Sequence, residues 1–566
     1  MAHSLFRVLL FSTVPWMTIL WSLKILENKA PYILSIVIAC MLALVYQCHV
    51  YPAYTTPFKP LPSLKSRGYL LGNHSRPIKW INGVFPQLCT EFGGEQIVRF
   101  YTLFNIELLM VVGPEAIAEI CLHKSDGFTH SQEGELLILA ALGHAGLFGA
   151  RGQMHKRLRK IFAPVFTTAT LATVCTNSLW PRCLAMVQEI DHHHYHHRAA
   201  GTAATPVQIG QWASTSILEL VGVCILGQSA GWLARYPDLA ATLTRRHANG
   251  QYAKAILPLF PRPVRSLLML TLFGRRELSD LAYLESVAGE LVQSAKEELG
   301  QQATSNSNGN SNSPPNLITA MLKDGNRNPS LSHEEILGHV SVFLAGGSET
   351  TSATFQWLII ELCRHPAVQS RLREEVRARW PTVSETKGNK NNNEKPLPLL
   401  SQIESIPYLR AVVDEVLRIH PATMVTQRQA RQDMTITGIR IPKGTMLMIP
   451  PTATNLNTRI WGDDAAMFNP DRWLRGRPAN NRMPSSGSSS KSNNQQACSI
   501  MTFGHGPQGC PGRSLARLML MCMAAAFVSE YEVSLEDPGQ SFVPTEALFT
   551  FPAPEVVVRL VKVSGP

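Results

Sequence analysis

The chain has 566 residues, of which 45% are hydrophobic and 16% charged. This balance is typical of a globular or membrane-attached protein and excludes a disordered chain. The formal net charge of +11 suits an anionic membrane surface or an acidic protein partner. The sequence has no basic stripe interleaved with aromatic residues, which argues against nucleic acid as a partner. Its 11 scattered cysteines form no CxxC pair, which argues against a zinc module or a disulfide framework and indicates a reducing compartment.

The N-terminal region is apolar and predicts a membrane anchor. Tyr32–Tyr51 contains 20 residues without a formal charge, the length of a helix that spans a bilayer, with a buried core helix as the alternative. An earlier apolar segment at 8–23 contains Pro15 and is either a second span or an interfacial segment. Prolines and positive charges follow the predicted span. We therefore expect residues 1–62 to form an anchor and a proline-rich neck, with the main body on the cytosolic side.

The main body, residues 63–566, is predicted to be one mostly helical domain with a minor sheet. Two short segments, Met434–Ile449 and Pro554–Val563, have the pattern of strands and turns. The histidine run His192–His197 has no acidic or thiolate ligand close by, so we interpret it as a surface loop, with a metal site as the alternative. Polar low-complexity segments that cannot support a core are predicted to be surface loops. These segments are 304–316, 387–395 and 484–497.

A long helix is predicted between Leu331 and Pro366. Ser332 and Glu335 have the spacing of a capping box at its start, and the proline limits its end.

The middle of this helix contains two adjacent glycines, Gly346 and Gly347. Glycine inside a helix costs about 1 kcal/mol relative to alanine, so the pair indicates a ligand that needs room against the helix. Glu349 and Thr350 follow, an acid and a hydroxyl that can pass protons. The alternative is a bent helix with a surface acid.

A second helical segment contains Glu415 and Arg418, which are three residues apart and therefore share a helix face. Arg428 is a further cation just past this helix, and Arg472 is placed to join the first two residues in a buried network. The alternative is a solvated pair on the surface.

Cys510 lies in the glycine-rich stretch FGHGPQGCPG, ahead of a long apolar segment. Pro511 is predicted at the first position of the following helix, which places the cysteine at about its N-cap. Helix N-termini favour a thiolate over a thiol. The surrounding glycines leave space for a flat, bulky group, and a lone thiolate with open space suits the axial position of a haem iron. A structural cysteine is the alternative.

Taken in this order, these elements resemble the cytochrome P-450 family of haem-thiolate monooxygenases over nearly the whole chain after the anchor. The stretch around Cys510 is similar to the family's ligand loop, and GGSETT, with Glu349 and Thr350, is similar to its oxygen-activation motif. Arg151–Phe166 is similar to the helix that contacts the haem propionates. Glu415, Arg418 and Arg472 match the family's buried structural triad.

The resemblance implies haem b with Cys510 as the only protein ligand to the iron. His155 stands where tryptophan is common in the propionate helix, and Gln508 stands where arginine or histidine is usual, so one charge-assisted contact is lost. The residues implied to bind the cofactor are His155, Arg159, Arg428, Phe503, Gln508, Cys510 and Gly512.

The implied fold is mainly α with a minor β part, with haem between the long helix and the helix that follows the cysteine loop. The implied activity is insertion of one atom of O2 into a hydrophobic small molecule, with electrons from NADPH. The chain carries no flavin or dinucleotide fingerprint, so a separate reductase is expected to deliver the electrons. The anchor, His155 and the polar insertions resemble membrane-bound fungal members in the endoplasmic reticulum, many of which serve terpenoid or polyketide pathways.

The resemblance also implies which segments overhang the haem and contact the substrate. These are the region Leu136–Leu147, and Phe343, Thr423, Met424, Val425, Leu548 and Phe549. The two alternatives to a monooxygenase are a haem-thiolate isomerase or dehydratase that needs no reductase, and a non-enzymatic haem-binding protein.

Overall fold

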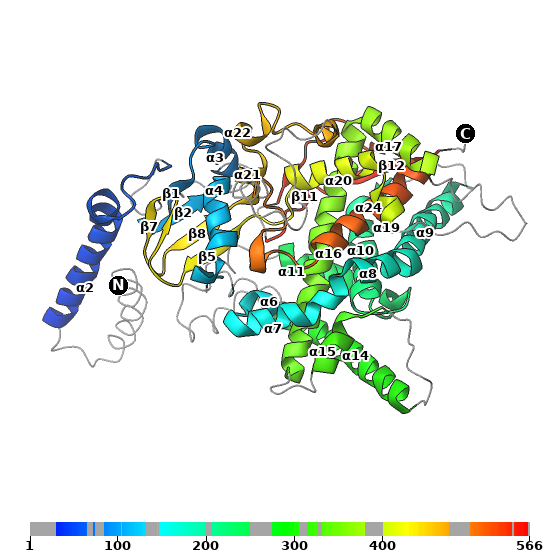
Figure 1. The fold of residues 1–566 in the computed structure, drawn as a ribbon, viewed down its shortest axis with the longest axis horizontal. Coiled ribbons are helices and arrows are strands. Elements are labelled where there is room, and N and C mark those ends of the chain that lie inside the picture. Colours follow the sequence, from blue (N-terminus) through cyan, green and yellow to red (C-terminus); the bar gives the residue numbers. More distant parts are fainter. Residues whose placement is uncertain are drawn as a thin grey trace, which may run out of the picture.

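The computed structural model consists of a helical body with a smaller β-rich part beside it (Figure 1). It describes residues 30–563 except for gaps. The gaps are 65–71, 74–83, 103–104, 132–134, 136–143, 145, 199–205, 249–273, 305–313, 325–330, 380–399, 475–497 and 546–547.

Helix α16 (His333–Arg364) runs through the helical body (Figure 1). Its start is the predicted capping box: the Ser332 hydroxyl accepts from the Glu335 N–H at 3.1 Å, and the Glu335 carboxylate accepts from the Ser332 N–H at 2.7 Å. Most of its residues are buried, because α10 (Ile209–Ile225), α20 (Pro407–Ile419), α24 (Arg513–Glu530) and α14 (Gly274–Thr304) pack around it. This helix therefore gives the body a rigid centre.

Further helices complete the body and cover the β-rich part. The longer ones are α7 (Gly152–Phe162), α8 (Thr168–Val174), α9 (Trp180–Arg198), α11 (Leu239–Ala248), α15 (Leu317–Asp324) and α17 (Pro366–Arg379). The shorter ones are α3 (Phe85–Glu91), α4 (Pro114–Ala118), α6 (Gly146–Gly149), α19 (Leu400–Glu404), α21 (Pro451–Asn455) and α22 (Thr458–Trp461). Short 3₁₀ and π turns include η4 (Glu119–His123), η5 (Ser125–Gly127), η6 (Ala163–Phe166), η7 (Cys175–Leu179), η8 (Trp232–Arg235), η10 (Pro470–Trp473) and η12 (Gly506–Gln508).

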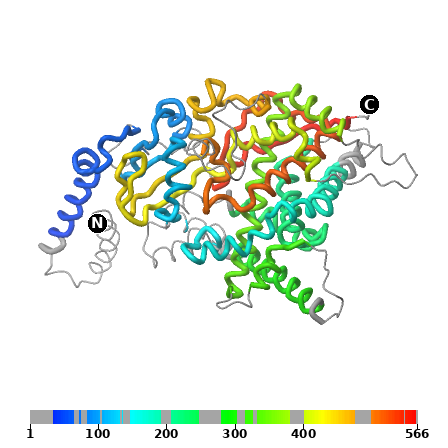
Figure 2. Tube along the Cα trace, viewed as in Figure 1, coloured from blue at the N-terminus to red at the C-terminus, as the bar shows by residue number. Residues whose placement is uncertain are grey.

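The main sheet joins segments that are far apart in the sequence. Its five strands have the order β1-β2-β8-β5-β3, and only the β2–β8 pair is parallel. Figure 2 shows the blue N-terminal and yellow later segments side by side in this part of the molecule. The strands are β1 (Ile97–Tyr101), β2 (Glu107–Val111), β3 (Phe128–Thr129), β5 (Thr426–Ala430) and β8 (Met446–Ile449).

Three smaller sheets lie elsewhere, with the orders β4-β12-β9, β6-β7 and β10-β11. The predicted strand segment Met434–Ile449 is confirmed, since it contains β6, β7 and β8, and Pro554–Val563 contains β12. Strands β1 to β5 and β9 to β11 were not predicted from the sequence. The bounds of the strands in the smaller sheets are β4 (Val207–Gln208), β6 (Met434–Ile436), β7 (Ile439–Ile441), β9 (Tyr531–Leu535), β10 (Val543–Pro544), β11 (Pro552–Ala553) and β12 (Val557–Lys562).

The apolar N-terminal segment is helical in the described residues. Helix α2 (Ala30–Val45) continues into the π turn η1 (Tyr46–Thr55). Of the described helices, the stretch Leu34–Thr55 is long and apolar enough to cross a membrane. The predicted apolar segment at 8–23 lies outside the described residues.

The end of this helix is attached to the main sheet. Cys48 is buried, and the Asn105 side-chain amide donates to its carbonyl oxygen at 2.8 Å. The Thr56 hydroxyl donates to Glu107 on β2 at 2.5 Å. The large apolar side chains of the helix farther from the sheet are exposed, as a helix in a lipid environment requires. They are Leu34, Ile36, Val37, Ile38, Met41, Leu42 and Val45.

The prediction of a surface loop at the histidine run was wrong. His192–His197 lies within α9, which extends to Arg198. A helix that is already nucleated adds residues at little cost, so α9 continues through a segment without an apolar pattern. Among the described residues, no group of three or more histidine, cysteine or acidic side chains could hold a metal ion. Of the predicted polar loops, 387–395 and 484–497 lie outside the described residues, and most of 304–316 does too.

Candidate haem-thiolate site

The loop that carries Cys510 has a backbone shape that depends on glycine. Gly504 and Gly506 have φ angles of 61° and 71°, and a Cβ atom on Gly506 would collide with the Cys121 carbonyl group. The Cys510 N–H donates to the Phe503 carbonyl oxygen at 2.8 Å, and the Gly509 N–H donates to that of Gly506 at 3.0 Å. These bonds fold the loop back on itself and leave the Cys510 side chain exposed.

The predicted position of Cys510 at the N-cap was wrong. Helix α24 begins at Arg513 with Gly512 as its N-cap, so Cys510 precedes the cap by two residues and Pro511 also lies outside the helix. The reason is that Gly512 has φ −83° and ψ 7° and does not continue a proline-started turn. Although solvent reaches the thiol, surrounding protein atoms raise its pKa by desolvation. The Gly512 N–H, Arg159 and Arg513 act in the opposite direction. A bound metal cation would deprotonate the thiol outright.

Two arginines beside the loop have the chemistry of an anion site. Arg159 on α7 donates to the Gly509 carbonyl oxygen at 2.8 Å. Arg428 on β5 is only 3% exposed and donates to the Gln427 carbonyl oxygen at 2.8 Å. Neither guanidinium has a carboxylate partner among the residues that the structure describes, and burial lowers the pKa of both. A buried cation such as Arg428 requires an anion, and two haem propionates would fit this pair of arginines.

Two histidines adjoin these arginines. His155 on α7 is buried, and its pKa is lowered by burial and by the charges of Arg159 and Arg428. His130 follows β3, and its Nδ1 lies 3.4 Å from Arg428 Nη1. Burial and the charge of Arg428 lower the pKa of His130 to about 3. A neutral imidazole can donate one hydrogen bond to a carboxylate. His130 was not predicted, because only the pairing of β3 with β5 places it beside Arg428.

Gln508 is the loop residue that stands where arginine or histidine is usual in the family. Its Oε1 atom is buried and has no hydrogen-bond partner among the described residues. The amide oxygen and nitrogen of glutamine are interchangeable by a 180° rotation, which would present an NH2 donor at the same place. Gln508 is therefore available to an acceptor such as a propionate.

The two glycines of α16 have different environments. A Cβ atom on Gly346 would meet no described heavy atom within 4 Å, whereas one on Gly347 would lie 3.2 Å from Val221 on α10. Gly346 therefore opens a face of the helix, and Gly347 permits close helix packing. Thr350 lies one turn after Gly346 on the same face, and its hydroxyl donates to the Gly346 carbonyl oxygen at 2.7 Å. Glu349 is buried, with 2% of its surface exposed.

A row of aromatic rings connects the cysteine loop with α16. A Cβ atom on Gly512 would lie 3.9 Å from the ring of Phe166, and that ring stacks on Phe343 with centroids 6.3 Å apart. Phe343 also meets Phe162 edge to face at 5.0 Å. Phe343 is 9% exposed, so its predicted substrate contact would come from a side chain held by these rings.

The structure brings two of the predicted substrate segments together. Thr423 forms an isolated antiparallel bridge with Phe549. Met424 and Val425 are partly buried against the core beneath the main sheet, and Leu548 is partly buried against the helical core. Most of the predicted region Leu136–Leu147 lies outside the described residues.

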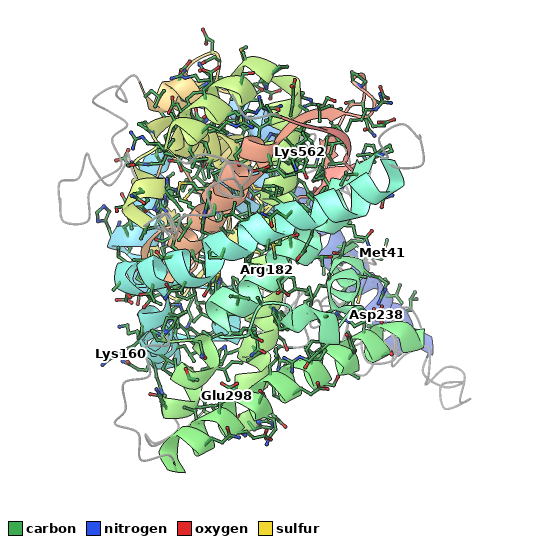
Figure 3. All side chains as sticks on the ribbon, turned by 90° about the vertical axis from the view of Figure 1, so that its right-hand side faces the viewer. Met41, Lys160, Arg182, Asp238, Glu298 and Lys562 are labelled. Atoms are coloured by element: carbon green, nitrogen blue, oxygen red, sulfur yellow. The ribbon has the colours of Figure 1, made fainter. Side chains whose placement is uncertain are left out.

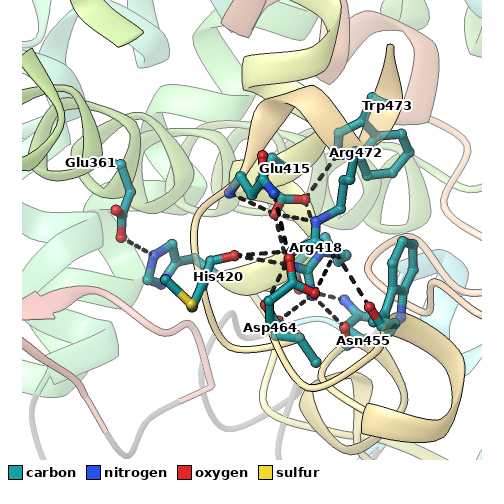
Figure 4. Close-up of polar contacts among 12 residues, drawn as sticks. Glu361, Glu415, Arg418, His420, Asn455, Asp464, Arg472 and Trp473 are labelled. Atoms are coloured by element: carbon teal, nitrogen blue, oxygen red, sulfur yellow. Dashed lines mark hydrogen bonds and ion pairs between the residues drawn. The ribbon is translucent and has the colours of Figure 1, made fainter. Parts of the chain in front are cut away.

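Glu415, Arg418 and Arg472 form a buried network (Figure 4). Both carboxylate oxygens of Glu415 accept from Arg418, at 2.7 and 2.9 Å, and one also accepts from Arg472 Nε at 2.8 Å. Arg418 is fully buried and also donates to the carbonyl oxygens of Asn455 and Ala465. The network ties the end of α20 to the segment that leads to the cysteine loop.

The glycine-shaped thiol loop, two arginines without a carboxylate partner among the described residues and the open helix face at Gly346 are together typical of a haem-thiolate oxidoreductase. The family model for cytochrome P450 matches residues 62–559, so the chain belongs to the cytochrome P450 family and is a haem-dependent monooxygenase. The chain is similar to the cytochrome P450 monooxygenase sphH of Aspergillus fumigatus, with 28% identity over 92% of this chain and 91% of the relative. It is also similar to the monooxygenase FUM15 of Gibberella moniliformis, with 28% identity over 87% and 86% of the two chains. The monooxygenase ptmK of Penicillium ochrochloron is 27% identical over 91% and 96%.

We expect Gln508→Arg to slow haem loss. The substitution adds a charged donor where the loop has an unpartnered amide, and a hydrogen bond to a charged group contributes about 1.5–3 kcal/mol. The rate of haem transfer to apomyoglobin measures this, with Gln508→Met as a control that removes the amide without adding charge. The Soret position should change little. A transfer rate in Gln508→Arg that equals or exceeds the wild-type rate would show that the other cations already neutralise both propionates.

Proposed function

We propose that this chain binds haem b through Cys510 and inserts one atom of O2 into a hydrophobic small molecule. The observation that carries the proposal is a pair of arginines, the partly buried Arg159 and the buried Arg428, which have no carboxylate partner among the described residues and lie beside a conformationally fixed thiol loop. Haem, when bound, supplies the redox chemistry that activates O2. The protein's own residues position the group, exclude water and move protons.

The roles of the residues follow from their places. Cys510 provides the thiolate, and Arg159, Arg428, His130 and His155 provide cations or donors for the propionates. His155 and Arg159 lie on α7, Arg428 lies on β5, and His130 directly follows β3.

Proton delivery is assigned to α16. The Thr350 hydroxyl donates to the Gly346 carbonyl oxygen, which leaves its lone pairs free to accept a hydrogen bond from a water molecule. Glu349 is the buried acid next to it. We infer that these two residues pass protons toward the O2 site, next to Gly346, where no described heavy atom fills the place of a side chain.

Electrons are proposed to come from NADPH through a separate membrane-bound reductase. Helix α7, which contacts the cysteine loop through Arg159, presents Lys156 and Lys160 to solvent. Figure 3 shows Lys160 at the edge of the molecule. Together with the net charge of +11, these lysines support docking of an acidic partner close to the thiolate.

We further propose that residues 1–62 anchor the protein in the endoplasmic reticulum membrane, with the monooxygenase domain, residues 63–566, facing the cytosol. The exposed apolar helix α2 and its attachment to the main sheet support this arrangement. The fungal relatives and the apolar residues of the proposed substrate segments favour a hydrophobic secondary metabolite, of terpenoid or polyketide type, as the substrate.

Co-expression in yeast with and without a fungal reductase tests this function. Cells are supplied with candidate terpenoid and polyketide intermediates under ¹⁸O2, and products are analysed by mass spectrometry. We expect a product that carries one ¹⁸O atom per oxidation and that depends on the reductase. The Cys510→Ala variant is the inactive control. A product formed without label, reductase or NADPH would indicate an isomerase or dehydratase instead.

A further inference from the structure

A second buried network on α16 has no part in the thiolate, propionate or proton-delivery groups. Glu361 lies near the end of the helix, and one of its carboxylate oxygens is 2.8 Å from His420 Nε2 (Figure 4). Its other oxygen lies 3.4 Å from His365 Nδ1. The ring of His420 stacks on the ring of Trp357, which lies one turn before Glu361 on α16. The ring centroids are 4.2 Å apart, and the interplanar angle is 4°. His420 is therefore held by α16 on two sides.

The same tryptophan reaches a different part of the chain. Its indole Nε1 donates to the Thr550 carbonyl oxygen at 2.9 Å. The Thr550 hydroxyl donates to the Pro421 carbonyl oxygen at 2.7 Å, and its N–H donates to that of Ala422 at 3.1 Å. His420 directly precedes Pro421. The hydrogen-bonded series from Trp357 through Thr550 to Pro421, called the ladder below, is therefore attached to α16 at both ends, through Trp357 and through His420.

The ladder continues into the proposed substrate site. Thr423 follows Ala422 and pairs with Phe549, which directly precedes Thr550. These two residues carry the apolar and hydroxyl groups that the segments would present to a ligand. A displacement of Thr550 or Pro421 would be passed to both of them, because direct hydrogen bonds of 2.7 and 3.1 Å join the two segments.

Charge strengthens the attachment at His420. Burial raises the pKa of Glu361, but the hydrogen bond from His420 and the charges of His420, His365 and Arg364 lower it below its usual value. Glu361 therefore remains a carboxylate, and hydrogen bonds to ionised groups are stronger than neutral ones. The segment after α20 is thus held by a stacked ring and a charge-assisted contact.

We propose that Trp357, Glu361 and His420 are positioning residues that set how the enzyme discriminates hydrophobic ligands by size. They do so by fixing the segments Pro421–Thr423 and Phe549–Thr550 relative to α16. This inference rests on the proposed function in one respect, namely that the two segments border the substrate site. Weakening the network lets the two segments move relative to α16, which favours bulky ligands over small ones.

Trp357→Phe tests the inference because it keeps an aromatic ring beside His420 and removes the donor to Thr550; the loss of ring volume that comes with it is matched by the control Trp212→Phe. Thr550→Val removes the bond to Pro421 at the other end of the ladder with little change in volume. The probes are 4-phenylimidazole, which is small, and clotrimazole, which is bulky; both bind haem iron and shift the Soret band. Titration yields the Kd of each ligand, and the readout is the ratio of the two Kd values.

We expect the ratio of the clotrimazole Kd to the 4-phenylimidazole Kd to fall roughly threefold to tenfold in each variant, the effect of one lost hydrogen bond. The double variant should show less than the sum of the two effects, since both act on one ladder. Trp212→Phe is the matched control: Trp212 packs against Phe355 of α16 and Phe527 and makes no described contact with either segment. Its ratio should equal the wild-type ratio.

Haem content and the carbon monoxide spectrum separate this inference from the proposed function. A wild-type protein without the thiolate spectrum would contradict the proposed function itself. A normal wild-type spectrum, with ratios unchanged in Trp357→Phe and Thr550→Val, would overturn the inference alone. A lower unfolding temperature with an unchanged ratio would have the same meaning, because the network would then only stabilise the fold. If Trp357→Phe does not fold, Thr550→Val and Glu361→Gln are compared with wild type instead, and the ratio of the two Kd values is again expected to fall.

Discussion

Arg418→Ala is expected to abolish most of the folded, haem-containing protein. Arg418 and Glu415 are both fully buried, and removal of the arginine leaves a carboxylate with only Arg472, Trp473 and the Asn469 N–H as described partners. Breaking a buried ion pair in this way costs about 3–5 kcal/mol. The whole free energy of unfolding of a domain is about 5–15 kcal/mol. The loss also frees the carbonyl oxygens that Arg418 holds, so the segment before the cysteine loop loses its attachment to α20.

The measurement is the ratio of haem to protein in detergent extracts, together with the thermal unfolding midpoint. Arg418→Lys should give an intermediate result, because an ammonium group keeps the charge but cannot match the fork of a guanidinium. Arg440→Ala is the matched control, since Arg440 pairs with Asp433 on the surface and both side chains are more than half exposed. Equal haem content in Arg418→Ala and Arg440→Ala would contradict the importance of the network.

Thr350→Ala is expected to keep haem bound while it separates NADPH consumption from product formation. The variant removes the hydroxyl on the open face of α16 but leaves the backbone of the helix intact. A positioned proton donor contributes about 10²–10⁴-fold to a proton-transfer step. Product should therefore fall steeply, while NADPH consumption continues and hydrogen peroxide accumulates. The three rates are measured in parallel with a purified reductase.

Two variants isolate the role of the hydroxyl. Thr350→Ser keeps it and should largely preserve coupling. Thr354→Ala removes a hydroxyl one turn later, where Thr354 donates to the Thr350 carbonyl oxygen at 2.9 Å and is 2% exposed. Coupling should stay normal there, because this hydroxyl is enclosed by protein. Unchanged coupling in Thr350→Ala would remove Thr350 from proton delivery.

The features that could be predicted from the sequence depend on local signals. The start of α16 follows from a serine and a glutamate three residues apart, and its end follows from Pro366, because these residues act within one helical turn. The pair of Glu415 and Arg418 is visible for the same reason. The family resemblance then extended these local signals to a site. The family match over residues 62–559 confirms the resemblance, and the site residues stay predictions.

The features that could not be predicted depend on contacts between distant segments. His130 lies in no recognisable motif, and only the β3–β5 pairing places it beside Arg428. The two glycines of α16 look alike in the sequence, but Val221 on α10 occupies the space next to Gly347 alone. The position of Cys510 before the helix cap depends on backbone angles at Gly512, because a glycine can either continue a helix or delay its start.

The central claim is that Cys510 is the thiolate ligand of a bound haem. The most direct measurement is the absorption spectrum of the reduced, carbon-monoxide-bound protein, recorded for wild type, Cys510→Ala and Cys498→Ala. Cys498 serves as the control because it lies 12 residues earlier in the chain and its side chain, unlike that of Cys510, is fully buried. We expect the red-shifted Soret band of thiolate ligation in wild type and in Cys498→Ala, and its complete loss in Cys510→Ala. A band that persists in Cys510→Ala would contradict the assignment.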